Sequence, residues 1–277
     1  MLAVLSLVST AACTHFDPSE AYWHYTLSGT AYCTENVSKE NFGCRPCRRS
    51  NSSVRELFVL TNASTDVRAF LGVFRRKGAS DDRIVLSVRG TESLENWIEN
   101  LKLYRTDRAM SCSSCRVHSG FYDVWASLQP SLMQQLNAVR QRYPNAPLTL
   151  TGHSLGAAVA ILGGYILERD LSIPVQAVYT FGSPRVGNAA FASTHPVGVG
   201  RQWRITHHRD IVPHLPEKLL GFRHTATEVF YANATQRGVI CDGSGEDDTN
   251  GADQYSFAFS VYDHLHYYGQ TIGENGC

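Results

Sequence analysis

The chain has 277 residues, of which 43% are hydrophobic and 18% are charged. This composition is typical of a globular protein and argues against a disordered one. Its 25 Lys and Arg residues balance 25 Asp and Glu residues, so there is no positive field to hold nucleic acid or an anionic membrane surface. The expected partner is therefore small or apolar.

The N-terminus, from Met1 to Ala12, is a short apolar stretch that ends in small residues. This pattern is typical of the core and cleavage region of a signal peptide, and it is too short to span a bilayer. No Lys or Arg precedes Lys39, so the positively charged start of most signal peptides is missing. Either the start is misassigned and the signal peptide is incomplete, or the stretch is a buried N-terminal segment. We expect residues 1–12 to be a signal peptide and residues 13–277 to form one domain.

Cysteines and glycosylation sequons agree with export. There are eight cysteines, and the Asn-x-Ser/Thr sequons lie at Asn36, Asn51, Asn62 and Asn233. The pairs Cys44-Arg-Pro-Cys47 and Cys112-Ser-Ser-Cys115 are too far apart for the ligand spacing of a zinc ribbon. Local disulfides in an oxidising compartment fit them better. The sequence predicts a secreted, extracellular glycoprotein with no bound metal.

Strand and helix patterns alternate along the chain. Residues 67–74 and 83–89 are rich in β-branched and aromatic side chains, and turn-forming residues 78–82 separate them, which predicts two neighbouring strands. Residues 121–139 carry apolar side chains at steps of three and four, the spacing of an amphipathic helix. We expect this helix to be broken or kinked near Pro130.

The same alternation continues downstream. Residues 148–152 form a short strand pattern, and residues 154–167 are rich in Ala, Gly, Ile and Leu. Further strands are expected at residues 175–181 and 203–207. This order predicts an α/β fold in which a mostly parallel sheet is flanked by helices.

The most informative motif is Gly152-His153-Ser154-Leu155-Gly156, a Gly-x-Ser-x-Gly sequence between an expected strand and an expected helix. In a nucleophile elbow the serine occupies a strained strand-to-helix turn, and the glycines remove side chains that would collide there. The turn exposes the hydroxyl of Ser154 and leaves the N–H of Leu155 able to stabilise an oxyanion. The alternative is an ordinary strand–helix turn.

A serine nucleophile needs a base to take its proton and an acid to orient that base. In folds with this elbow the chain order is Ser, then Asp or Glu, then His. Asp210 follows the expected strand at residues 203–207 and is the candidate acid. The histidines late in the chain are His214, His224, His264 and His266. The last two rank highest, and the residues alone do not separate them.

Taken together, these segments resemble the fungal-type class 3 lipase family, from about Tyr32 to Cys277. The elbow motif, Phe181-Gly-Ser-Pro-Arg-Val-Gly-Asn188 and Asp210-Ile-Val-Pro213 are similar to successive family segments. His264-Leu-His-Tyr-Tyr-Gly269 resembles the family's C-terminal motif, which assigns the base to His264 and leaves His266 without a catalytic role. The resemblance implies an α/β-hydrolase fold with a short helical lid.

The resemblance also covers residues 89–98. It implies that Thr91 completes the oxyanion hole with Leu155. It places the start of the lid at Ser93, Leu94, Glu95, Asn96, Trp97 and Ile98. The helical spacing of Leu94, Trp97 and Ile98 gives this segment one apolar face, which a lid hides in water and exposes at a lipid interface. An ordinary surface helix packed on the core is the alternative.

Three disulfides are implied by the resemblance: Cys33–Cys277, Cys44–Cys47 and Cys112–Cys115. Cys241 departs from the relatives, because no second cysteine lies near it. It is either a free thiol or bonded to Cys13. The acidic residues that follow it lack the spacing of an EF-hand, so a solvated loop is favoured over a calcium site. No cofactor is expected.

The resemblance implies a secreted lipase that hydrolyses acylglycerol esters at a lipid–water interface with Ser154, His264 and Asp210. The first alternative is a feruloyl esterase or another hydrolase of soluble esters, with the same three residues. The second is a non-catalytic lipid-binding homologue, since a fold alone implies no activity. No transmembrane segment is expected, and the sequence carries no signal for an oligomeric state.

Overall fold

A computed structural model describes residues 16–91, 94–103, 107–194, 201–225, 227–233, 238–241, 250–255 and 259–277. The expected signal peptide and Cys13 lie outside these residues, as do Ser93 and most of the acidic loop after Cys241. Among the helices of the described residues, none has the length and apolar character needed to cross a membrane.

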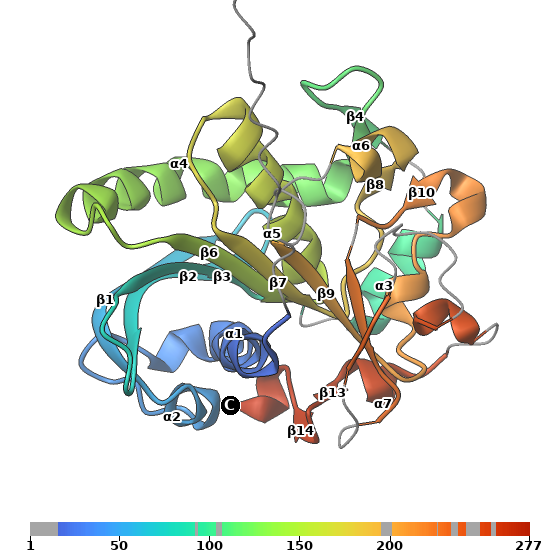
Figure 1. Cartoon of the computed structure of the whole chain (residues 1–277). Coiled ribbons are helices and arrows are strands. Elements are labelled where there is room, and N and C mark those ends of the chain that lie inside the picture. Colours follow the sequence, from blue (N-terminus) through green and yellow to red (C-terminus); the bar gives the residue numbers. More distant parts are fainter. Residues whose placement is uncertain are drawn as a thin grey trace, which may run out of the picture.

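A mixed sheet of eight strands forms the centre of the molecule (Figure 1). Its order is β1-β2-β3-β6-β7-β9-β11-β12. The strands are β1 (Ser52–Asn62), β2 (Val67–Arg76), β3 (Arg83–Val88), β6 (Leu148–His153), β7 (Ala177–Phe181), β9 (Gln202–His207), β11 (Glu228–Tyr231) and β12 (Val239–Ile240). Pairing is parallel from β3 to β11 and antiparallel at both edges. The predicted strands and the mostly parallel sheet are confirmed.

Two small sheets lie beside the main one. One has the order β10-β8-β5-β4 and the other pairs β13 with β14. Their strands are β4 (Asp107–Ala109), β5 (Arg116–His118), β8 (Gly187–Asn188), β10 (Phe222–Arg223), β13 (His266–Tyr267) and β14 (Gln270–Thr271).

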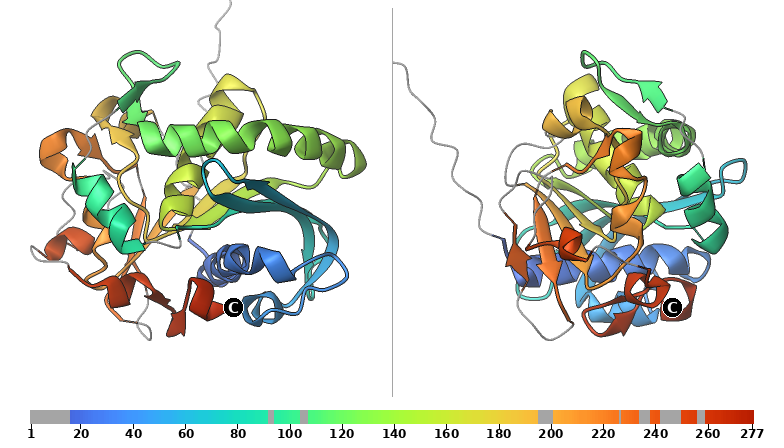
Figure 2. Two further views of the ribbon diagram at one scale, coloured as in Figure 1. Left: turned by 180° about the vertical axis from the view of Figure 1, so that it is seen from behind. Right: turned by 90° about the vertical axis from the view of Figure 1, so that its right-hand side faces the viewer.

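Helices cover both faces of the main sheet (Figures 1 and 2). On one face lie α4 (Ser119–Arg142) and α5 (Leu155–Tyr165), and α1 (Pro18–Thr30) packs against β6 and β7 on the other, next to α2 (Arg45–Arg49). Three more helices are α3 (Leu94–Leu103), α6 (Ala189–Ser193) and α7 (Val261–His264). Short 3-10 segments are Ala31–Asn36, Val212–His214, Lys218–Leu220, Ala252–Gln254 and Glu274–Gly276. This is the arrangement of the predicted α/β-hydrolase fold.

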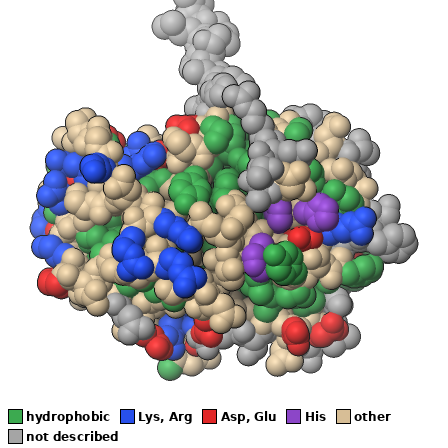
Figure 3. All heavy atoms as spheres, turned by 90° about the horizontal axis from the view of Figure 1, so that it is seen from below, with side chains coloured by type: hydrophobic (Ala, Val, Ile, Leu, Met, Phe, Trp, Pro, Cys, Tyr) green, Lys and Arg blue, Asp and Glu red, His purple; other side chains and the backbone are tan. Residues whose placement is uncertain are grey.

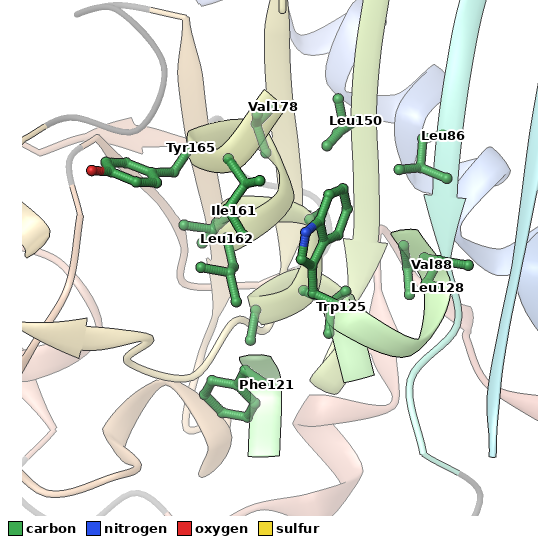
Figure 4. Close-up of a cluster of buried hydrophobic side chains, with 14 of the residues drawn as sticks. Leu86, Val88, Phe121, Trp125, Leu128, Leu150, Ile161, Leu162, Tyr165 and Val178 are labelled. Atoms are coloured by element: carbon green, nitrogen blue, oxygen red, sulfur yellow. The ribbon is translucent and has the colours of Figure 1, made fainter. Parts of the chain in front are cut away.

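The largest core cluster is centred on Trp125 of α4, which is fully buried between α5 and the sheet (Figure 4). A Cβ atom on Gly163 of α5 would lie 2.3 Å from the Trp125 ring. The close packing of α4 on α5 therefore depends on a glycine at this position. This packing holds α5 in place, and α5 is the helix that begins next to Ser154.

The predicted break near Pro130 is wrong, because α4 runs without interruption from Ser119 to Arg142. Proline removes one hydrogen bond to the carbonyl four residues earlier. Both Pro130 and Ala126 are on the exposed side of α4, so water can reach the carbonyl that loses its partner. The opposite side buries six apolar side chains, including Trp125, which holds the helix together.

The chain ends beside its own N-terminal part. Cys277 is bonded to Cys33 across 244 residues of sequence, and the C-terminus lies next to α2 (Figure 1). Cys44–Cys47 and Cys112–Cys115 are also bonded. The structure therefore contains the three disulfides that the family resemblance implied.

The face seen from below carries charges of both signs (Figure 3). Lys and Arg side chains gather mainly over one half of this face, and histidine side chains over the other. Arginines of the strands pair with nearby acids: Arg76 and Arg83 both contact Glu20 of α1.

Candidate active site

Ser154 occupies the sharp turn between β6 and α5, with φ of 61° and ψ of −127°. A left-handed φ is unusual for a residue with a side chain and marks a strained position. The flanking glycines are required sterically. A Cβ on Gly152 would lie 2.3 Å from the carbonyl oxygen of Gly156, and one on Gly156 would lie 2.1 Å from that of Val88. The local geometry is that of a nucleophile elbow.

Asp210 and His264 form a buried hydrogen-bonded pair. The His264 Nδ1 atom lies 2.9 Å from both carboxylate oxygens of Asp210, and the two residues are 0% and 1% exposed. Asp210 follows β9, and His264 is the last residue of α7. A single β-bridge between Asp210 and Ser260, the N-cap of α7, joins the two segments.

Two further groups hold the Asp210 carboxylate. The Tyr267 hydroxyl donates to Oδ2 at 2.7 Å, and the Val212 N–H donates to Oδ1 at 2.8 Å. Burial, followed by the charge of Asp210, raises the pKa of Tyr267 well above its usual value of 10. Tyr267 is therefore a neutral donor at physiological pH. Tyr267 lies within the C-terminal motif, but sequence patterns gave no signal for this role.

Ser154 and His264 meet at one small cavity of about 140 Å³. Neither Ser154 Oγ nor His264 Nε2 has a hydrogen-bond partner among the described residues, although both atoms are buried. Unsatisfied buried polar atoms are rare in proteins and often mark a functional site. Hydrogen bonds of a catalytic pair are commonly long before substrate binds, so this geometry suits a serine and its base.

The other late histidines lie elsewhere. His224 Nε2 donates to the carbonyl of Pro213, and His214 lies 3.9 Å from Asp253. His266 Nδ1 donates to the carbonyl of Tyr262. None of these three lines the cavity of Ser154, and the structure brings only His264 of the four next to Asp210.

A larger cavity of about 560 Å³ adjoins the elbow and is lined by Leu155 and by Phe121 and Val124 of α4. Thr91 lines both this cavity and the smaller one. Leu155 is the first residue of α5, the position at which a backbone N–H has no partner within the helix. Thr91 and Leu155 thus both lie beside the elbow, and the oxyanion hole expected from them stays a prediction.

Helix α3 lies over the larger cavity. Trp97 and Leu101 line that cavity, and Leu94 lines the smaller one. Ile98 and Leu101 are buried, whereas Glu95 and Asn96 are exposed. The helix extends to Leu103, five residues beyond the segment named from sequence. Its apolar face points inward, as both a closed lid and an ordinary surface helix require.

The glycosylation sequons occupy different environments. Asn51 and Asn233 are exposed, whereas the side-chain amide of Asn62 donates to the carbonyl of Ser127. Asn36 is the last residue of a 3-10 segment, and its side chain is outside the described part. Cys241 is buried. Because Cys13 lies outside the described residues, both alternatives for Cys241 stay predictions.

Comparison with known proteins places these features in a family. Residues 85–220 match the family model for class 3 lipases. A lipase of Rhizomucor miehei is 32% identical over 270 residues, which are 95% of this chain and 71% of that protein. A secreted mono- and diacylglycerol lipase of Penicillium cyclopium is 28% identical over 259 residues, 91% of this chain and 82% of that protein.

Solved structures agree. Lipase II of Rhizopus niveus superimposes with a TM-score of 0.80 at 27% identity, covering 92% of this chain and 95% of that one. A triacylglycerol lipase whose catalytic centre is formed by a serine protease triad gives a TM-score of 0.78 at 29% identity, with the same coverage. The chain therefore belongs to the fungal-type class 3 lipase family.

Proposed function

We propose that this protein is a secreted lipase that hydrolyses acylglycerol esters through Ser154, His264 and Asp210. The observation that carries the proposal is the pair of unsatisfied buried atoms, Ser154 Oγ and His264 Nε2, at one cavity. The other nitrogen of His264 is held by Asp210, as the orientation of a general base requires.

The proposed reaction begins with attack of Ser154 Oγ on the ester carbonyl carbon. His264 Nε2 takes the hydroxyl proton and then gives it to the leaving alcohol oxygen, which forms the acyl-enzyme. Water then attacks the acyl carbon and gives a proton to His264 Nε2. His264 returns this proton to Ser154 Oγ as the carboxylic acid leaves. Asp210 keeps the Nδ1 proton of His264 in place and stabilises the imidazolium that forms. The backbone N–H groups of Thr91 and Leu155 stabilise the oxyanion.

The larger cavity supports a lipid substrate. Its wall contains Trp97, Leu101, Phe121, Val124 and Leu155, and it adjoins the elbow. A largely apolar cavity of several hundred Å³ suits an acyl chain, since ligand sites bury most of a ligand against apolar side chains. Several relatives are described as lipases of mono- and diacylglycerols or of triacylglycerols. We assign the same substrate class to this chain.

Helix α3 is proposed as the lid. Its inward face lines both cavities, the larger through Trp97 and Leu101 and the smaller through Leu94. Opening moves these apolar side chains into contact with solvent, which is unfavourable in water and favourable at a lipid surface. The expected result is higher activity on an emulsion than on the same ester in solution.

The proposal is tested by comparing rates on an emulsified long-chain triglyceride and on methyl ferulate. Preference for the triglyceride, with a rise in rate where the ester forms an interface, supports the lipase assignment. Preference for ferulate keeps the serine hydrolase mechanism and replaces the substrate class. An inactive protein whose Ser154 is not labelled by a fluorophosphonate favours a non-catalytic lipid-binding homologue.

A further inference from the structure

The side chain of His153 joins three segments that are far apart in the sequence. Its Nδ1 atom lies 2.8 Å from the Tyr32 hydroxyl, and its Nε2 atom lies 2.8 Å from the main-chain carbonyl oxygen of His264. Tyr32 is in the 3-10 segment Ala31–Asn36, and His153 is the last residue of β6. His153 thus contacts the backbone of His264, the candidate base, whereas Asp210 contacts the side chain of His264.

The direction of each hydrogen bond follows from the chemistry of the partners. A carbonyl oxygen only accepts, so His153 Nε2 carries the proton and Nδ1 accepts from the Tyr32 hydroxyl. Burial, and then the neighbouring His264, lower the pKa of His153 well below its usual 6.5. Burial raises the pKa of Tyr32 above its usual 10. Both side chains are therefore neutral, and only one arrangement of the two protons satisfies both bonds.

The Tyr32 hydroxyl also adjoins the segment that carries Thr91. A Cβ on Gly90 would lie 2.1 Å from the Tyr32 hydroxyl oxygen and 3.0 Å from the Cβ of Ser154. A backbone hydrogen bond from Gly90 acts on the Tyr32 hydroxyl. Gly90 directly precedes Thr91, so the hydroxyl lies between the expected oxyanion segment and the elbow.

We propose that Tyr32 and His153 are positioning residues, which hold the oxyanion segment, the nucleophile and the backbone of the base in one arrangement. The proposal rests on the proposed function of Ser154 and His264. Neither residue is assigned a proton transfer. His153 directly precedes Ser154, so a single side chain links the elbow to the main chain of His264.

The hydrogen bond from His153 to His264 matters because α7, which carries His264, is short. This helix has four residues and is followed by a turn with a left-handed Tyr268 and Gly269. Asp210 fixes the His264 ring at Nδ1, but rotation about that one contact still moves Nε2 relative to Ser154. The bond from His153 to the carbonyl, together with the ring contact at 4.4 Å between centroids, restricts this movement. Misplacement of a reacting group by about 1 Å lowers a rate by about a hundredfold.

The first experiment replaces one hydroxyl group. Tyr32→Phe removes the donor to His153 and keeps the ring, and Tyr25→Phe is the matched control. Tyr25 is a buried tyrosine of the N-terminal region, whereas Tyr32 is partly buried, and the Tyr25 hydroxyl donates to the carbonyl of Gln270 at 3.0 Å, away from the cavity of Ser154. With a soluble p-nitrophenyl butyrate, we expect kcat of Tyr32→Phe to fall about tenfold or more with KM within twofold. We expect Tyr25→Phe to keep both constants, with a similar change in Tm.

The second experiment tests the bond to His264. His153→Gln keeps an amide N–H that can reach the carbonyl of His264, whereas His153→Leu has no donor. We expect His153→Gln to retain more of the wild-type kcat than His153→Leu. We also expect Tyr32→Phe to cause no further loss of kcat in the His153→Leu background, since Tyr32 and His153 act as one unit. Folding of each variant is checked by Tm.

The outcomes separate the two proposals. The positioning role is overturned by any one of three results: full kcat in Tyr32→Phe, equal losses of kcat in His153→Gln and His153→Leu, or additive losses of kcat in the double variant. In each of these cases hydrolysis by the wild type still supports the proposed function. A wild-type protein that hydrolyses no ester overturns the proposed function, and the positioning role with it.

Discussion

Gly182 lies directly against the carboxylate of Asp210. A Cβ atom on Gly182 would be 2.7 Å from Asp210 Oδ2 and 2.8 Å from His264 Nδ1. The backbone at Gly182 has a φ of 58°, the left-handed region, and its N–H donates to the carbonyl of Ile205. The end of β7 therefore forms the surface on which the acid and the base pack.

Gly182→Ala is expected to separate Asp210 from His264 and to lower kcat about a hundredfold. Gly221→Ala is the matched control, because Gly221 has a φ of 88° and nothing within 4 Å of an added Cβ. Both variants carry the backbone strain of a left-handed alanine, about 1 kcal/mol. Similar Tm values with a loss of kcat in Gly182→Ala alone support the packing argument. Equal kcat values would contradict it.

Replacement of Trp97 tests the lid. Trp97→Ser removes the largest apolar side chain of the inward face of α3, so the open helix gains less from contact with lipid. We expect the ratio of the rate on emulsified triglyceride to the rate on soluble butyrate to fall about tenfold. Asn96→Ser, on the exposed side of the same helix, is the control and should leave the ratio unchanged. If both substrates lose rate equally in Trp97→Ser, α3 is an ordinary surface helix.

The three disulfides are expected to differ in their contribution to stability. In the chain-entropy model, loss of Cys33–Cys277, which closes 244 residues, costs about 5 kcal/mol, and loss of Cys112–Cys115 costs about 2 kcal/mol. Serine double variants of each pair, unfolded in urea, measure the difference. Loss of the first pair should also lower activity, because residues 271–275 line the cavity of Ser154. Equal stabilities for the two double variants would contradict the loop-length argument.

The buried side chain of His24 is expected to lower the free energy of unfolding in mild acid. Its Nδ1 donates to the carbonyl of Glu20 and its Nε2 accepts from Thr149, and burial lowers its pKa to about 3 from the usual 6.5. Between these two pH values the unfolded chain binds a proton that the folded protein does not, so the free energy of unfolding falls as pH falls. From pH 7 to pH 5 this residue accounts for about 2 kcal/mol.

His24→Gln should therefore remove about 2 kcal/mol of the pH dependence between pH 7 and pH 5, measured by urea unfolding. Tyr25→Phe, a neighbouring change without a histidine, is the control and should keep the wild-type dependence. An unchanged dependence in His24→Gln would show that the folded protein accepts the proton.

Sequence patterns located the elbow and five strands of the main sheet, but not β1, β11 or β12. Residues 67–74, 83–89 and 148–152 lie in neighbouring strands of one sheet, as their composition indicated. These patterns are local, because each strand's own side chains carry them. The break expected near Pro130 is absent because the local rule ignored the burial of the opposite side of α4, which is a tertiary effect.

The contacts of the site were less accessible to sequence analysis. Tyr32 and His153 are 121 residues apart, and no periodicity indicates that their side chains meet. Gly182 belongs to a segment that matched the family, but its steric role appears only when Asp210 and His264 are in place. Residues alone left His264 and His266 as equal candidates, since they are two positions apart and their different directions depend on the turn after α7.

The most direct test of the account is hydrolysis of an emulsified long-chain triglyceride by the wild-type protein and by Ser154→Ala. We expect release of fatty acid by the wild type and a loss of at least about a thousandfold in the variant, with an unchanged Tm. Activity that persists in Ser154→Ala would contradict the assignment of Ser154 as the nucleophile.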